Sequence, residues 1–241
     1  MSGLHKLLIA NRGEIAVRIA RTAAELGVTT LAVHAQDDAQ SLHVRVADGA
    51  VALEGSGPAA YLDAARILQI AVEQGCDAIH PGYGFLSENA AFAEACEASG
   101  LTFVGPGPGT LSLFGDKGAA RALAAREGLQ ILAGTEGATS LDEARAFLDS
   151  LGAGGAVMVK AVSGGGGRGM RPARTQDELT QAWDRCGSEA FSAFGDGSLY
   201  VERFLERARH VEVQIVGDGR EVSHLWDREC SLQRQRQKII E

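Results

Sequence analysis

The chain has 241 residues, 45% of them hydrophobic and 22% charged, with a formal net charge of −8. This composition supports a substantial core in one or two domains and excludes the disordered and fibrous classes of protein. The acidic balance argues against general nucleic-acid binding, which needs a basic surface, and no apolar stretch is long enough to span a membrane.

The opening apolar run is too short for a signal peptide, so we expect a cytoplasmic protein. The four cysteines form no CxxC pair, and we expect their thiols to be reduced.

Short apolar runs alternate with helical patterns over the first 113 residues. The alternation predicts an α/β domain on a parallel sheet, and a Gly/Pro cluster at 105–108 marks its end. We expect strands at 6–10, 30–34, 49–53, 78–80 and 101–104, and helices at 14–26, 61–74 and 89–98.

Residues 114–241 change to a mixed pattern of helices and antiparallel strands. Capping boxes beginning at Ser140 and Thr175 each open a helix, and a further helix is expected at 116–126. The Gly-Asp-Gly sequence at 217–219 is typical of a hairpin turn. The expected strands lie at 156–162, 170–174, 199–205, 210–216 and 221–227.

A glycine-rich segment at 163–169 follows the strand that contains Lys160. It is not a dinucleotide fingerprint, since Pro172 disfavours the helix that must follow, and no GK[ST] makes it a P-loop. Either it is a flexible surface loop, or its backbone N–H groups approach phosphate oxygens and close over a nucleotide as a lid. Lys160 favours the lid, because an ammonium in an apolar strand needs an anionic partner that a phosphate would supply.

Three further segments each leave two interpretations open. The alternation of His210, Glu212 and Gln214 with apolar residues fits an ordinary half-exposed strand or the polar face of a pocket. The cationic run at 228–238 is a solvated edge or an anion-binding segment. Tyr83 lies in a turn after a strand, where it is part of a structural turn or faces a ligand.

Taken together, these segments resemble biotin carboxylase, the ATP-grasp component of biotin-dependent carboxylases, in order through the whole chain. The nearest match is the biotin carboxylase subunit or domain of acyl-CoA carboxylases, which act in fatty acid metabolism; pyruvate and urea carboxylases share the pattern. The matching motifs are IANRGEIAVRI (9–19), HPGYGFLSEN (80–89), FVGP (103–106), GDK (115–117), VKAVSGGGGRGM (159–170), YVERFLERARHVEVQ (200–214) and RECSLQRQRQK (228–238).

The resemblance implies a fold and a reaction. The fold is a Rossmann-like parallel-sheet pre-ATP-grasp domain over 1–113, followed by an incomplete ATP-grasp domain over 114–241 with an antiparallel, glycine-rich lid at about 131–203. The reaction is the ATP-dependent carboxylation of biotin by bicarbonate through carboxyphosphate, catalysed by positioning and charge neutralisation. The implied partners are a biotin carboxyl carrier protein or domain and a carboxyltransferase, and the full-length form is expected to be a homodimer.

The resemblance also assigns roles by motif. Lys238 would hold bicarbonate as the catalytic residue, and Tyr83 would approach biotin. Arg203 replaces a usual lysine, and Arg236 stands where the family has histidine, so that contact gains a fixed charge. The ATP-binding set is Lys117, Lys160, Gly164, Gly165, Gly166, Gly167, Met170, Glu202, Arg203, Leu205, His210, Gln233 and Arg236.

The family's two metal-binding carboxylates, its general base and its main dimer surface are expected beyond Glu241. We therefore expect no Mg²⁺ ligand within this chain, and a fragment that is inactive alone. Two alternatives stay open: another ATP-grasp ligase of the carbamoyl-phosphate synthetase kind, or a non-catalytic nucleotide-binding module. The sequence does not indicate which acyl-CoA or keto acid finally receives the carboxyl group.

Overall fold

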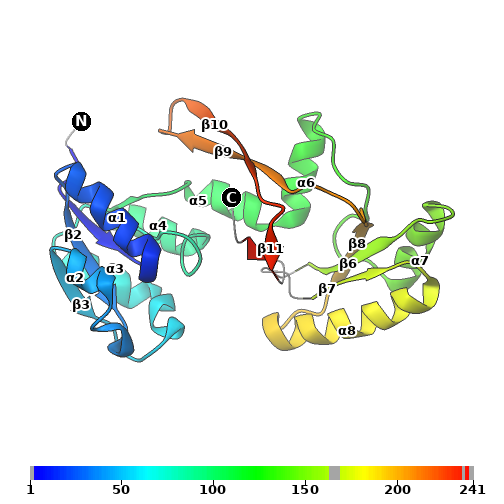
Figure 1. Cartoon of the computed structure of the whole chain (residues 1–241), viewed down its shortest axis with the longest axis horizontal. Helices are drawn as coiled ribbons and strands as arrows, with labels where there is room; N and C mark the ends of the chain where they lie inside the picture. The colour runs from blue at the N-terminus through cyan, green and yellow to red at the C-terminus, as the bar shows by residue number, and fades with distance from the viewer. Residues whose placement is uncertain (1–2, 163–168, 235–236, 239–241) are drawn as a thin grey trace. The chain divides into compact units, whose positions relative to one another are not determined.

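The computed structural model describes residues 3–162, 169–234 and 237–238 (Figure 1). The chain divides into two compact units, Met1–Ala120 and Arg121–Glu241. The division falls within one helix, α6 (Lys117–Arg126). Each unit has its own hydrophobic core, so each is described by itself.

The first unit is built on a five-stranded sheet in which every neighbouring pair is parallel. Its order is β3-β2-β1-β4-β5, which confirms the predicted α/β class. The chain runs outward from β1 on one side and then returns to build the other side from β4. The strands are β1 (Lys6–Ile9), β2 (Thr29–His34), β3 (Gly49–Ala52), β4 (Ala78–His80) and β5 (Thr102–Phe103).

Helices cover both faces of this sheet because its buried strands are apolar on both sides. Leu7 and Ile9 of β1 pack with α1 (Gly13–Glu25), whereas Leu8 between them belongs to the core on the opposite face. That second core includes α3 (Ala64–Glu73) and α4 (Ala90–Ala98). The remaining helical elements are η1 (Gln36–Asp38), α2 (Leu42–Val46), η2 (Pro58–Leu62) and α5 (Pro108–Gly115).

The second unit contains a three-stranded antiparallel sheet in the order β7-β6-β8. Figure 1 shows α8 running along one face of this sheet, where α8 and α7 bury Val157, Val159 and Ala161 of β6. Both predicted capping residues, Ser140 and Thr175, accept a hydrogen bond from the backbone three residues later. The elements are α7 (Leu141–Ser150), β6 (Val157–Ala161), β7 (Met170–Ala173), α8 (Gln176–Phe194) and β8 (Leu199–Arg203).

The predicted hairpin near the end of the chain is confirmed. β9 (Val211–Gly217) and β10 (Val222–Glu229) pair antiparallel, and the Asp218 carboxylate accepts from the backbone of Arg220 and Glu221 in the turn. The register shifts between His224 and Asp227. Beyond it, β11 (Gln233–Arg234) pairs antiparallel with β12 (Gln237–Lys238).

Candidate nucleotide and biotin sites

Lys160 lies on the face of the β7-β6-β8 sheet that is opposite α7 and α8. Alternate residues of β6 enter the core, so Val159 and Ala161 are buried and Lys160 points to the other side. On β8, Val201 enters the same core and Glu202 therefore shares the face of Lys160. Because Lys160 is paired with Tyr200 in the register, Glu202 is its diagonal neighbour, within reach of a long side chain.

Glu202 supplies the anion that Lys160 needs. The Lys160 ammonium donates to Glu202 Oε2 in a close ion pair, and Glu202 is only 6% exposed. The predicted need for a negative partner is therefore met inside the chain, by a carboxylate that the sequence reasoning placed beside adenine instead. A buried carboxylate is costly unless it is paired, which explains why the two side chains meet.

Arg121 of α6 is a second cation on the same carboxylate. Its Nη1 donates to Glu202 Oε1 at 2.6 Å, and its Nη2 donates to the Leu132 carbonyl at 2.7 Å. The pKa of the neighbouring Tyr200 rises to about 12, first through burial and then through the charge of Glu202, while Arg121 acts in the opposite sense. Sequence reasoning missed Arg121, because 81 residues separate it from Glu202 and no periodic pattern joins them.

The chain before α7 forms the other edge of this site. Thr135 N donates to Val201 O at 2.9 Å and Arg203 N donates to Ala133 O at 2.8 Å, so residues 133–135 extend the sheet alongside β8. The approach requires glycine at 134, because a Cβ there would lie 2.7 Å from Val201 O.

The other predicted ATP-binding residues occupy varied environments. Met170 is paired with Lys160 across β6 and β7, and Gln233 Nε2 lies 2.9 Å from His210 Nδ1. Arg203 and Leu205 are exposed at the end of β8. Lys117 begins α6 in the first unit, and Lys238 closes β12. Gly164, Gly165, Gly166, Gly167 and Arg236 lie outside the described residues.

The polar side chains on one face of β9 have hydrogen-bond and ion-pair partners within the hairpin. Arg228 of β10 donates to Gln214 Oε1 at 2.7 Å and forms an ion pair with Glu212 Oε1 at 3.1 Å. Both acceptors are half-buried, whereas Val213 and Ile215 on the alternate face are exposed. The alternation is confirmed, and these contacts favour an ordinary strand over the polar face of a pocket.

In the first unit, Tyr83 lies where the direction of strand order reverses, between β1 and β4. Asn11 follows β1, is 2% exposed, and donates from Nδ2 to Pro81 O at 2.6 Å and Tyr83 O at 2.8 Å. The fit is tight, since a Cβ at Gly82, whose φ is +66°, would lie 2.7 Å from Asn11 Nδ2. Asn11 thus links the loop after β1 to the loop after β4. In an open parallel sheet, ligands usually bind in the crevice between two such loops.

The Tyr83 side chain is 62% exposed at this crevice. Its hydroxyl donates to the Glu14 carboxylate in the first turn of α1. That hydrogen bond raises the pKa of Tyr83, so the phenol stays protonated. Glu14 therefore orients the residue predicted to face biotin; its place within the matching IANRGEIAVRI motif was the available signal.

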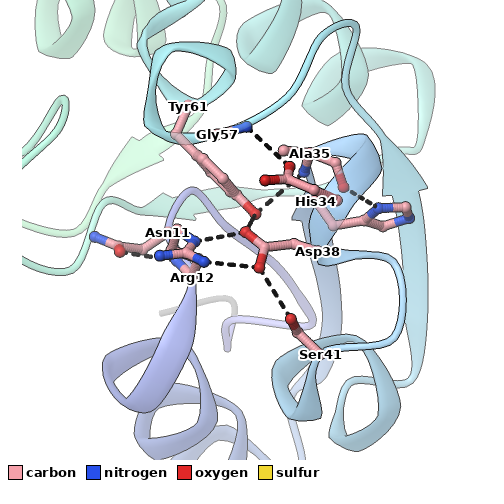
Figure 2. A network of polar contacts seen from close by, with 9 residues as sticks. Asn11, Arg12, His34, Ala35, Asp38, Ser41, Gly57 and Tyr61 are labelled. Carbon is pink, nitrogen blue, oxygen red and sulfur yellow. Dashed lines mark hydrogen bonds and ion pairs between the residues drawn. The ribbon is translucent and has the colours of Figure 1, made fainter.

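Arg12 anchors the same loop through a polar network around Asp38, shown in Figure 2. Arg12 Nε and Nη2 lie 2.5 and 2.7 Å from the two Asp38 oxygens, and the Tyr61 hydroxyl and Ser41 Oγ each donate to Asp38 at 2.9 Å. Arg12, followed by Tyr61 and Ser41, holds the pKa of Asp38 far below its ordinary value despite burial. No role was predicted for Arg12 from the sequence, yet Arg12 holds the start of α1 in place.

The described residues offer no metal centre. No group of three or more His, Cys, Asp or Glu side chains within them could hold a metal ion. All four cysteines are buried and free, as the sequence predicts. No helix in the described part of the chain is long and apolar enough to cross a bilayer.

Two family models account for nearly the whole chain. Residues 3–111 match the biotin carboxylase N-terminal domain, and residues 116–241 match the ATP-binding domain of the carbamoyl-phosphate synthase L chain. Among curated relatives, pyruvate carboxylase of Aspergillus niger is 49% identical over an alignment of 242 residues, which covers 98% of this chain and 20% of that protein. The chain thus spans about a fifth of the length of the curated relatives that it matches.

Solved structures agree with this match. Campylobacter jejuni biotin carboxylase, as a β-γ-ATP complex, gives a TM-score of 0.93 at 38% identity, covering 98% of this chain and 53% of that one. The biotin carboxylase domain dimer of Hydrogenobacter thermophilus 2-oxoglutarate carboxylase, with MgADP, ADP and bicarbonate, gives 0.92 at 41% identity, covering 99% and 52%. The parallel-sheet unit and the unit with the antiparallel sheets therefore match the biotin carboxylase N-terminal and ATP-grasp folds, and the chain belongs to the biotin carboxylase family.

Proposed function

We propose that this chain supplies the nucleotide and biotin sites for ATP-dependent carboxylation of biotin by bicarbonate. The observation that carries the proposal is Lys160, a cation held by Glu202 on the face of the antiparallel sheet opposite α7 and α8, three residues before the glycine-rich sequence begins. Such a cation fits a nucleotide phosphate, because charge-assisted hydrogen bonds are the strong ones and phosphoryl transfer depends mainly on positioning and charge.

In this proposal the residues divide by substrate. Lys117 and Lys160 bind the ATP phosphates, the lid glycines cover them, and the segment from Glu202 to Leu205 lies beside adenine. Lys238 holds bicarbonate, whose oxygen attacks the γ-phosphorus to form carboxyphosphate and release ADP. Carboxyphosphate then breaks into CO₂ and inorganic phosphate, and the ureido nitrogen of the biotin ring that Tyr83 faces takes up the CO₂ and gives its proton to that phosphate. Mg²⁺ would neutralise the phosphates; the described residues contain no group of three or more His, Cys, Asp or Glu side chains that could hold it, and no residue is assigned to it.

The partners are part of the proposal. Pyruvate carboxylase relatives and a 2-oxoglutarate carboxylase domain support a carboxylase with a biotin carrier and a carboxyltransferase, in a homodimeric whole protein. The expected match to acyl-CoA carboxylases in particular stays a prediction, and the curated relative named above is a pyruvate carboxylase. The domain limits 1–113 and 114–241 likewise stay a proposal. The match of residues 3–111 favours a carboxylase over a carbamoyl-phosphate synthetase.

Isothermal titration of the chain with ATP and Mg²⁺ tests the nucleotide site. Lys160→Ala should weaken ATP binding about tenfold or more, since a charged hydrogen bond contributes roughly 1.5–3 kcal/mol. Lys6→Ala is the matched control, because Lys6 lies on β1 and donates to the Gln74 carbonyl. Equal affinities for the wild type and both variants would remove Lys160 from the phosphate site.

A further inference from the structure

On the face of the β7-β6-β8 sheet opposite α7 and α8, two cations contact one carboxylate. Glu202 accepts from Lys160 at one oxygen and from Arg121 at the other. The side chain of Glu202 is 8% exposed, while those of Arg121 and Lys160 are 24% and 26% exposed. The cluster therefore retains one net positive charge in a partly desolvated place, where charges act more strongly than in water.

The two cations are held differently. Arg121 uses both terminal nitrogens, one on Glu202 and one on the Leu132 carbonyl, so its planar guanidinium is fixed in direction. Lys160 contacts Glu202 through an ammonium, which has three N–H donors, and a single bond to Glu202 uses one of them. Of the two, Lys160 is better suited to follow a ligand oxygen.

We infer that Arg121 is a positioning residue of the nucleotide-phosphate site, acting by neutralising Glu202. With Arg121 present, the charge of Glu202 is balanced and the charge of Lys160 remains available to a nucleoside di- or triphosphate. Without Arg121, Glu202 and Lys160 neutralise each other, and a phosphate must compete with the carboxylate for the ammonium. The inference rests on the proposed function, since it takes Lys160 to be a phosphate ligand.

A purely structural Arg121 is the competing explanation, because the same side chain ties Leu132 to β8. Removing the negative charge of Glu202 separates the two explanations. If Arg121 acts by charge, it becomes unnecessary once Glu202 is neutral; if it acts by tying the chain together, its loss stays harmful. Glu202→Gln keeps the length of the side chain and the backbone of β8.

The experiment measures ADP and ATP dissociation constants for the whole chain by titration calorimetry. We expect Arg121→Met to weaken both nucleotides about tenfold and Arg121→Lys to recover most of that loss; Glu202→Gln, whatever its own affinity, is the background in which the second comparison is made. The double variant Arg121→Met/Glu202→Gln should return to within about threefold of Glu202→Gln alone. Arg126→Met, on the same helix with its side chain 74% exposed, is the control and should bind like the wild type.

Folding of every variant is checked by Trp183 fluorescence in urea, since Trp183 packs against the core of this unit. A double variant that binds about tenfold more weakly than Glu202→Gln, or an Arg121→Met variant that binds like the wild type, would overturn the role of Arg121 and leave the proposed function standing. A wild-type chain that binds neither nucleotide would instead refute the proposed function, and the inference with it.

Discussion

Asp38 shows how a single carboxylate can hold a functional loop. Arg12 and Ser41 donate to it from two segments, and the Tyr61 hydroxyl both donates to Asp38 and accepts from Ala35 N at 3.1 Å. Tyr61 is fully buried, so its hydroxyl has no solvent to replace these partners. The start of α1, which carries Glu14, therefore depends on this buried network.

Tyr61→Phe should lower the stability of the first unit by about 1–3 kcal/mol, because it leaves the Ala35 N–H unsatisfied without changing the packing volume. The measurement is amide hydrogen exchange in β2, which lies next to Ala35. Tyr83→Phe is the matched control: its hydroxyl is at the surface, and we expect a change within about 0.5 kcal/mol. Equal losses in the two variants would contradict the structural role of the network.

For single residues, the sequence indicated which side chain needs a partner but not which residue supplies it. Lys160 stood out because an ammonium in an apolar strand needs an anion, but the anion is Glu202, 42 residues away. Pairing of that kind depends on strand register, which neither strand's own periodicity contains. Arg121 and Asp38 carry no local signal, so tertiary contacts alone reveal them.

Among the elements, the edge of β8 depends most on one small residue. At Gly134 a Cβ would lie 2.7 Å from Val201 O and 3.0 Å from Glu202 Cγ. The first contact is with backbone, which cannot rotate away. Any side chain at this position must push residues 133–135 away from the strand that carries Glu202.

Gly134→Ala should destabilise the second unit by about 1–3 kcal/mol, the usual cost of overpacking. Urea unfolding followed by Trp183 fluorescence measures the loss. Gly187→Ala, inside α8, is the control: its Cβ would lie 3.7 Å from its nearest neighbours, and the gain in helix propensity is up to about 1 kcal/mol. A Gly134→Ala variant as stable as the wild type would show that the segment can move without cost.

Elements with strong local patterns were predictable from the sequence. β4 lies at the expected residues, and the helix expected at 61–74 begins instead at Ala64, where the Asp63 carboxylate caps Arg66 N and η2 precedes it. The sequence reasoning missed α2, which has only five residues and includes two valines, a poor helix former. Short helices of this kind depend on tertiary packing.

Over the chain as a whole, the order of the strands in the parallel sheet could not be predicted from the sequence. Apolar runs indicated a parallel sheet, but not that β4 returns to the far side of β1. That return brings Asn11 and Tyr83 together, and so places the candidate biotin site. The two units also differ in their histidines, because the two with a lowered pKa, the buried His43 and the half-buried His80, both lie in the first unit.

Acidification should therefore destabilise the first unit selectively. Burial lowers the pKa of His43, although Val33 and Asp38 act in the opposite sense, and burial also lowers the pKa of His80. Below about pH 6.5 these two histidines therefore bind protons in the unfolded chain more readily than in the folded unit, since the ordinary histidine pKa is about 6.5. Stability is complete above about pH 6.5 and falls as the pH drops below it, by up to about 1.4 kcal/mol per pH unit for each histidine.

Two probes can be read on one sample, because both tryptophans, Trp183 and Trp226, lie in the second unit. Between pH 7.5 and 5.5 we expect exchange protection factors in β1 and β4 to fall, after correction for intrinsic exchange, while the urea midpoint of tryptophan fluorescence stays nearly constant. His43→Leu should reduce the fall in β1 and β4, since a residue that cannot be protonated contributes no linkage. A tryptophan midpoint that drops in parallel with the protection factors would mean that the two units unfold as one.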